Sequence, residues 1–394
     1  MPTLTPRLTT IFAIACGLAV ANIYYVQPLL ATIDRDFGVG AGAGSIVVTL
    51  TQLGYALGLV AIVPLADLIE NRTLVVRVLM GTTVALVAIA LAPTYAAFLA
   101  AAIVVGITSV AAQILVPFAA HLAPDATRGR VVGRVMSGLL VGVLLSRAFA
   151  GVVGGAVGWR AVYFVAAVGI AAIAIVLARA LPRRAPTYGG SYGALLRSLV
   201  TIYRREPVLR RRALYQSLMF ASFSAFWTSI TFLLASPRYG FSATQIGIFA
   251  LAGATGALVA PLGGRLGDAG HSRIGTAVAL AIGAAGFALT LVPSLWTLVL
   301  AALALDAATQ GTLVLGQRAI YALAPAERGR LNTLFIATFF VGGAAGSAAS
   351  GLAYERFGWD GVVALGATLP LLALGWWLTE SRAAASIASE RIAG

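Results

Sequence analysis

The chain has 394 residues, of which 60% are hydrophobic and only 10% are charged, and its mean hydropathy is +0.95. Soluble domains carry about a quarter charged residues, so this chain has too few charges to cover a surface that faces water. A soluble enzyme is therefore excluded, and lipid is the expected solvent. The net charge of +14 comes from arginines in short connectors rather than on helix faces, which argues against nucleic-acid binding.

Twelve apolar segments of about 20 residues predict twelve spanning helices, because a helix needs about that length to cross the hydrocarbon core. Backbone polar groups in lipid must be satisfied within the segment, so each segment is expected to be helical. The first six segments are 8–30, 44–66, 74–92, 95–119, 131–156 and 160–181. The second six are 213–235, 243–265, 274–293, 295–317, 331–353 and 361–379. The first run is too long for a signal-peptide core of about 7–15 residues, so we expect it to be retained.

Arginines gather in the connectors on one side of the predicted membrane, whereas the opposite connectors are short and mostly acidic. The positive-inside rule therefore predicts a multi-pass protein of the bacterial inner membrane with both termini in the cytoplasm. The basic connectors contain Arg128, Arg130, Arg134, Arg183, Arg184, Arg197, Arg204, Arg205, Arg210, Arg211, Arg212, Arg328 and Arg330. The opposite connectors contain Asp34, Asp36, Glu355 and Asp360.

The sequence repeats itself at an offset of about 200 residues. The Leu-Ala-Pro and Arg-Gly-Arg runs of 122–130 return in 323–330, and Gly158-Trp159 returns as Gly358-Trp359. The repeat predicts an all-α protein with an N-terminal six-helix bundle (1–181), a basic cytoplasmic linker (182–212) and a C-terminal six-helix bundle (213–394). Apolar residues at near-helical spacing between 192 and 203 favour an interfacial helix in the linker over a plain loop.

A Gly-x-x-x-Asp-x-x-Gly-x-Arg pattern joins the second and third helices of each half. Residues 264–273 keep it, with Asp268 and Arg273; residues 63–72 keep Asp67 and Arg72 but lose both glycines. In this motif, and in its two parallel halves, the chain resembles the major facilitator superfamily over nearly its whole length. The resemblance implies a cytoplasmic gate in which these acids face helix N-termini and arginines of the other half in one conformer. The alternative is an ordinary ion pair between loops.

Helix 5 keeps the small-residue spacing of the drug/proton antiporters of this superfamily in 142–151, but Arg147 stands at the proline position. In helix 4, Ala102 stands where those antiporters carry an arginine four residues before a glycine. Residues 21–30, 305–310, 317–321 and 330–333 resemble a bacterial branch of drug-efflux-like permeases. The resemblance therefore implies transport more firmly than it implies a substrate or proton coupling.

Two charges, Arg147 and Asp306, lie near the middle of their predicted spans. A charge at that depth costs at least about 2.5–3.5 kcal/mol on insertion scales, so it is a functional hypothesis by default. An acid that faces a wet cavity and Arg147 in turn can load and release a proton, which makes the two residues proton-coupling candidates. The alternative is a mutually satisfied pair that holds the halves together.

Polar and aromatic side chains form stripes on helices 1, 2, 4, 7 and 10, and in the superfamily fold helices 1, 4, 7 and 10 line the central cavity. The resemblance makes these side chains substrate-cavity candidates, although packing between helices would explain each one alone. The candidates are Asn22, Tyr25, Gln52, Tyr55, Ser109, Gln113, Gln216, Phe220, Phe223, Trp227 and Gln310.

The expected function is secondary active transport: export of a small amphipathic compound in exchange for protons by alternating access, by a functional monomer in the lipid bilayer. The transport alternative is import of a small organic anion held by Arg147. A membrane-embedded sensor or enzyme is the other class, and no catalytic constellation in the spans favours it. Cys16, His121 and His271 have no metal-ligand spacing, so neither a metal nor a cofactor is expected.

Overall fold

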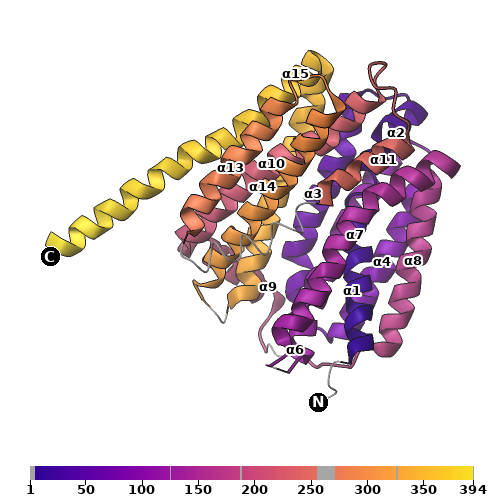
Figure 1. Ribbon diagram of the computed structural model, residues 1–394. Helices are drawn as coiled ribbons and strands as arrows, with labels where there is room; N and C mark the ends of the chain where they lie inside the picture. The colour runs from indigo at the N-terminus through magenta and orange to yellow at the C-terminus, as the bar shows by residue number, and fades with distance from the viewer. Residues whose placement is uncertain (1–4, 125, 187–188, 255–270, 325–326, 394) are drawn as a thin grey trace.

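A computed structural model describes residues 5–124, 126–186, 189–254, 271–324 and 327–393, and within these ranges the chain is helical and contains no strand (Figure 1). The first part of the chain forms α1 (Pro6–Ala21), η1 (Gln27–Leu29), α2 (Leu30–Phe37), α3 (Ala41–Ala61), η2 (Val63–Asp67), α4 (Asn71–Ala90), α5 (Tyr95–Thr108), α6 (Ala111–Leu122), α7 (Arg128–Val157) and α8 (Trp159–Ala180). The second part forms α9 (Tyr192–Arg205), α10 (Pro207–Ala235), α11 (Ala243–Phe249), η3 (Ala250–Ala254), α13 (Ser272–Leu289), α14 (Leu295–Tyr321) and α15 (Arg328–Ala393).

Nine helices in the described ranges are long and apolar enough to cross a membrane, and α1 and the α11–η3 segment are shorter apolar helices. Helix α15 covers the last two predicted spans, which are separated by a sharp turn at Gly358. The φ of Gly358 is 62°, a conformation that glycine adopts at little cost. Counted in this way, the described elements follow the predicted segments, apart from residues 255–265 of the eighth, which lie outside the described residues; the all-α twelve-helix fold is confirmed.

The first and the fourth of the predicted spans are broken by turns. In the first, α1 ends at Ala21, and the chain passes through turns and η1 before α2 begins. Pro28 lacks a backbone N–H and cannot continue a helix from the preceding turn, which explains the break. In the fourth, α5 ends at Thr108, and the hydroxyl of Ser109 donates to the carbonyl of Val105 at 2.6 Å instead of pointing into a cavity.

The helices form two groups, with α1 to α8 on one side and α10, α13, α14 and α15 on the other, while α11 lies against α7 of the first group (Figure 1). The N-terminus and α9 lie at one end of the molecule, and α2 and α11 lie at the opposite end (Figure 1). Glycines allow close approach within the first group, since a methyl group on Gly142 of α7 would overlap the backbone of Gly17 on α1. Small residues of this kind replace hydrophobic driving force as the basis of helix packing in lipid.

Helix α9 is tied to both groups. The hydroxyl of Tyr192 donates to the carbonyl of Ala61, at the end of α3, over 2.7 Å. At the other end of α9, Arg205 forms ion pairs with Glu206 at 2.9 Å and with Glu327, just before α15, at 2.6 Å. The linker therefore contains a helix with one hydrogen bond to the first group and one ion pair to the second.

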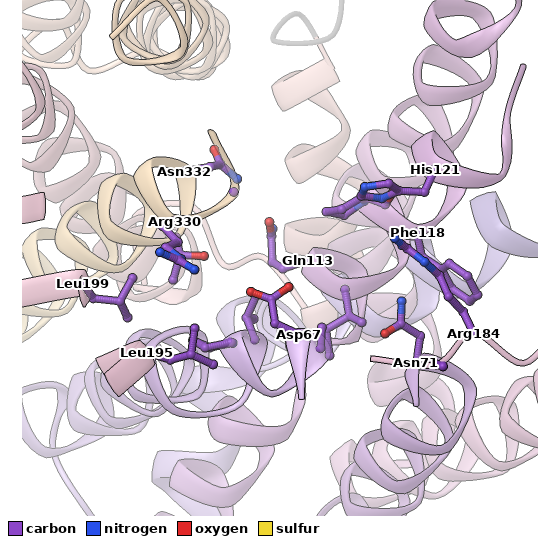
Figure 2. A pocket seen from close by; sticks show the side chains of 18 residues that line it. Asp67, Asn71, Gln113, Phe118, His121, Arg184, Leu195, Leu199, Arg330 and Asn332 are labelled. Carbon is purple, nitrogen blue, oxygen red and sulfur yellow. The ribbon is translucent and has the colours of Figure 1, made fainter. Parts of the chain in front are cut away.

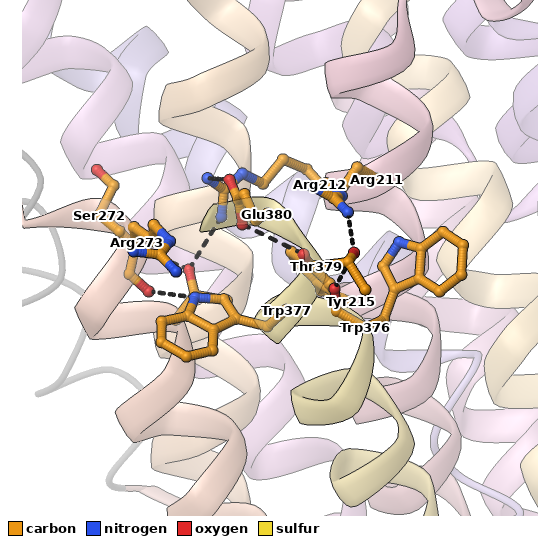
Figure 3. A network of polar contacts seen from close by, with 10 residues as sticks. Arg211, Arg212, Tyr215, Ser272, Arg273, Trp376, Trp377, Thr379 and Glu380 are labelled. Atoms are coloured by element: carbon orange, nitrogen blue, oxygen red, sulfur yellow. Dashed lines mark hydrogen bonds and ion pairs between the residues drawn. The ribbon is translucent and has the colours of Figure 1, made fainter. Parts of the chain in front are cut away.

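A polar network anchors the final spanning segment at the end of the molecule that carries α9 (Figure 3). Arg212 on α10 pairs with Glu380 on α15 at 2.9 Å, and the hydroxyl of Tyr215 donates to the same carboxylate at 3.2 Å. The guanidinium of Arg273 lies 4.4 Å from the ring centroid of Trp377, whose indole N–H donates to the Arg273 carbonyl at 3.0 Å. Arg273, a predicted gate residue, thus packs on α15 of its own group.

Candidate functional site

A cavity of about 320 Å³ lies between the two groups of helices, near α9 (Figure 2). Asp67 of η2 and Gln113 of α6, both predicted from the sequence, line it together with Arg330 at the start of α15. In Figure 2 the Asp67 carboxylate lies between Arg330 and Asn332 on one side and Asn71 and Phe118 on the other. We call this end of the molecule the cavity end. The other liners include Val63, Pro64, Ile114, Pro117, His121, Arg184, Leu195, Leu199 and Thr333.

The first-half gate motif is built around a helix cap. Glu70, which replaces a glycine of the motif, accepts hydrogen bonds from the backbone N–H groups of Arg72 at 2.9 Å and Thr73 at 3.2 Å, and so caps α4. Burial alone would raise the pKa of Glu70, but the hydrogen bonds from Thr73 and from the backbone hold it below its ordinary value. At this position the side chain of Glu70 caps the N-terminus of α4, a role that a glycine cannot fill. Asp268, the second-half acid, lies outside the described residues.

At the opposite end, the closed end, the two groups of helices contact each other directly. The hydroxyl of Ser347 on α15 donates to the carbonyl of Ser45 on α3 at 3.3 Å, and that of Thr49 donates to Ala344 at 3.2 Å. On the other side of the interface, a methyl group on Gly151 of α7 would overlap the backbone of α11. The molecule therefore has a cavity between its halves at one end and tight helix packing between them at the other.

Arg147 lies between the two halves, one turn before Gly151 on α7, where the contact between α7 and α11 ends. Its side chain is 3% exposed, and its Nε donates to Oε1 of Gln27 in η1 at 2.6 Å. Three aromatic rings surround its guanidinium: Trp227 at 4.4 Å, Tyr24 at 4.9 Å and Phe223 at 5.7 Å from the ring centroids. Two of these rings come from α10, so a cation of the first half sits in an aromatic cage that the second half largely supplies.

Asp306 on α14 is the acid of this cluster. It is 6% exposed, and Arg147 and the indole of Trp227 act on it electrostatically, although no ion pair with Arg147 forms in the described structure. Gly253 makes room for it, because a methyl group there would overlap Oδ2 of Asp306 and lie 3.2 Å from the Trp227 ring. The structure thus brings together the two mid-membrane charges that the sequence singled out.

Two buried N–H donors of this cluster have no hydrogen-bond acceptor among the described residues. They are Nη2 of Arg147 and Nε2 of Gln27, and both side chains line the same small void beside Trp227. A buried donor that lacks an acceptor costs about 1–3 kcal/mol, so the cluster has unused capacity to bind an acceptor. Sequence reasoning missed Gln27, although an amide in an otherwise apolar run beside a proline was a usable signal.

Several other predicted cavity residues connect the two halves. Gln52 donates from Nε2 to the hydroxyl of Ser224 at 2.7 Å, and the ring of Tyr55 packs on that of Phe340 with centroids 4.5 Å apart. Nε2 of Gln113 donates to the hydroxyl of Tyr55 at 3.3 Å, which links this contact to the cavity. These side chains lie between the halves, on helices 2, 4, 7 and 11.

Other contacts of the predicted cavity residues lie within one half. Phe220 stacks on Phe223 with centroids 5.4 Å apart, and Nε2 of Gln216 donates to the carbonyl of Thr309 at 3.4 Å. Asn22 donates to the carbonyl of Ala19 at 3.1 Å. Tyr25 packs on Phe149 at 5.6 Å, and Gln310 is half-buried on α14.

Comparison with known proteins places this architecture in a family. The model of the Major Facilitator Superfamily matches residues 12–290 and 218–393. The transporter YgaY of Escherichia coli (strain K12) is 42% identical over 380 residues, covering 95% of this chain and 96% of the relative. The transporter SCO4007 of Streptomyces coelicolor is 35% identical over 387 residues, covering 95% of this chain and 87% of the relative.

Solved structures share the fold at low sequence identity. A bacterial homologue of the human lysosomal transporter Spinster, in an inward-facing and unoccupied conformation, superposes with a TM-score of 0.76 at 16% identity, covering 95% of this chain and 96% of that one. The human organic anion transporter MFSD10 superposes with a TM-score of 0.71 at 18% identity, covering 95% and 100%. With transporters as its relatives and its structural neighbours, and with the family model matching along its length, the chain is a multi-pass membrane transporter, not an enzyme, and it belongs to the major facilitator superfamily.

Proposed function

We propose that the protein exports a small amphipathic compound across the bacterial inner membrane in exchange for protons, as a monomer with both termini in the cytoplasm. The observation that carries this proposal is the burial of Asp306 beside Arg147 between the two halves. An acid at that place changes its surroundings whenever the halves rock, because Arg147 belongs to the first half and Asp306 to the second. A change of surroundings between conformers is what couples a protonation step to a conformational step.

The cavity end supports the inward-facing part of this cycle. Its cavity takes a compound from the cytoplasmic side, and the aromatic rings of Phe220, Phe223 and Trp227 offer apolar contact deeper in the molecule. Asp67 and Arg330 line the mouth from opposite halves, so they are placed to approach each other when this end closes. In this proposal Asp67 is a residue of the cytoplasmic gate. Arg72 belongs to the same loop, and its backbone N–H donates to Glu70 at the start of α4.

The proposal is tested with the purified protein in liposomes. A pH gradient is imposed, and uptake and counterflow are measured over a panel of cationic dyes, sugars and carboxylates. We expect a dye or another amphipathic compound to move against its gradient when protons move the other way, and empty liposomes serve as the control. Uptake of a carboxylate that ignores the pH gradient would overturn export by proton exchange.

Import of a small organic anion is a second candidate, favoured by the unpartnered donors of Arg147 and Gln27. A carboxylate would satisfy both, since such groups accept several hydrogen bonds at once. This function would need no proton carrier, and Asp306 would then balance the charge of the empty site.

The Arg147→Lys variant separates the two candidates. Lysine keeps the positive charge but loses the planar fork of donors and most of the stacking on aromatic rings. For the exporter we expect the proton-driven rate to stay within about threefold of the wild-type rate. For the anion importer, a lost hydrogen bond to a charged group costs about 1.5–3 kcal/mol, so uptake would fall by roughly tenfold or more. Initial rates in liposomes decide between these outcomes, and Arg160→Lys, at an exposed ion pair, is the matched control.

A further inference from the structure

A second buried acid, Asp34, lies at the closed end and plays no part in the proposed proton exchange at Asp306. It belongs to α2, which lies outside the candidate membrane spans, and its side chain is 6% exposed. Neither carboxylate oxygen of Asp34 has a hydrogen-bond partner among the described residues. An ionised carboxylate that is buried without a partner is one of the most costly arrangements in a folded protein, so the geometry selects the neutral acid.

The acid is held against the helix that closes this end. A methyl group built on Gly44 of α3 would overlap both oxygens of Asp34, so the carboxyl group lies directly on the α3 backbone. On the neighbouring turn, the Glu355 side chain from the second half lies in the same way over Gly42. Ser45, the next residue of α3, makes the contacts with Ser347 and Gly351 of α15. The α3 segment 42–45 is therefore sandwiched between Asp34 and α15.

Few charged groups surround Asp34. Tyr95 on α5, which donates to the carbonyl of Ala43, is the titratable group that interacts with it electrostatically. Asp36 is bound to Arg160 and to the indole of Trp159, and so is already partnered. The second half of α10, η1 and the first half of α3 contain no ionisable residue. The other charged residues at this end are Arg35 on α2, Arg238 after α10, and Glu355, Arg356 and Asp360 on α15.

We propose that Asp34 is a proton-binding site of the closed end: its carboxyl group is neutral while α3 is docked on α15, and it releases its proton when this end opens and water reaches it. The ligand is a proton rather than a metal ion, because no group of three acidic, histidine or cysteine residues that could hold a metal occurs in the described part of the chain. The site makes opening of this end sensitive to the pH on that side of the membrane, whichever substrate the transporter carries.

The direction of the effect follows from the burial. Desolvation raises the pKa of Asp34 to about 7 in the closed conformer, whereas a hydrated Asp titrates near about 3.9. The closed conformer therefore binds the proton more tightly, and acid favours it. As the pH rises from about 4 to 7, the ratio of open to closed molecules should rise by up to about tenfold per pH unit, and it should level off above pH 7.

The test measures the opening of this end directly. The single cysteine, Cys16, is replaced by alanine, and spin labels are attached to Ala96→Cys in the first half and Phe357→Cys in the second, both exposed at the closed end. Distances between the labels are recorded in liposomes from pH 4.5 to 8.5. With Asp34 present, we expect the fraction of molecules with a long distance between the two labels to increase as the pH rises to 7. Asp34→Asn and Asp34→Ser should remove this dependence and keep the short distance throughout.

Asp36→Asn is the matched control, since it removes an exposed acid from the same helix and should leave the pH profile of the wild type. Two replacements of Asp34 are used so that misfolding of one, seen by size-exclusion chromatography, leaves the other to decide. An unchanged pH profile in the Asp34 variants would overturn the proposal, because the titrating group would then lie elsewhere. A response of the distance to Na⁺ at constant pH would overturn it as well.

Discussion

The Asp306→Asn variant is expected to lose proton-driven transport while keeping substrate exchange. Asparagine has almost the same shape as aspartic acid and can still approach the indole of Trp227 and the space above Gly253. It carries no exchangeable charge, so it cannot load a proton in one conformer and release it in the other. Counterflow, in which labelled and unlabelled substrate exchange without net movement of protons, requires only that the halves rock.

The two assays together identify the role of Asp306. We expect gradient-driven accumulation to fall to the level of empty liposomes, and counterflow to stay within a few-fold of wild type. Asp360→Asn, which removes an exposed acid of the same half, should leave both unchanged. Full gradient-driven accumulation in Asp306→Asn would exclude this residue as the proton carrier. Loss of both activities, with the protein still folded, would instead indicate that Asp306 and Arg147 hold the halves together, since removal of one partner leaves an uncompensated buried charge.

Gly151→Val is expected to slow transport at least several-fold, because the added side chain keeps α7 and α11 apart at the closed end. A side chain at this position would overlap the carbonyl of Ala243 and the Cα atom of Gly247 on α11, which are backbone atoms that cannot move aside. Overpacking of a well-packed contact costs about 1–3 kcal/mol, and each 1.4 kcal/mol shifts a conformational equilibrium by about tenfold. The conformer with the cavity open at the α9 end should therefore lose roughly 5-fold to 140-fold in population relative to the other conformer.

The measurement is the initial rate of substrate uptake in liposomes at equal amounts of folded protein. Gly169→Val is a well-matched control, because Gly169 also lies in a membrane helix, α8, but has nothing within 4 Å of the position of a Cβ atom. We expect the control to transport at close to the wild-type rate. Wild-type transport by Gly151→Val would show that the contact between α7 and α11 is not needed in the cycle.

Hydropathy predicted where the helices would lie, because lipid forces every span to satisfy its own backbone hydrogen bonds. It could not predict the breaks near Asn22 and Ser109, since an apolar run looks the same whether the chain is helical or turned. The break after Ala21 changes which side chains surround Arg147. Helical spacing placed Asn22 and Tyr25 on the inward face of helix 1, whereas the turns after Ala21 bring Tyr24 to the guanidinium of Arg147.

The charges of the site were predictable, and their surroundings were not. Arg147 and Asp306 stood out because a charge in an apolar span is rare and costly. The aromatic cage depends on contacts between residues about 80 positions apart, such as Arg147 with Trp227, and no local pattern encodes these. Asp34 was read as one of several acids in a short connector, because its burial is created by Gly44, a residue with no side chain to signal the contact.

The two attachments of α9 have a mechanical consequence. One end of this helix is fixed to the end of α3 through Tyr192, and the other is fixed near the start of α15 through Arg205 and Glu327. This helix has 14 residues and is about 21 Å long, and it connects the two groups of helices beside the cavity. Spreading of the two bundles beyond the length of α9 therefore breaks one of its two attachments, so the opening of this side involves a segment outside the bilayer-crossing part of the chain.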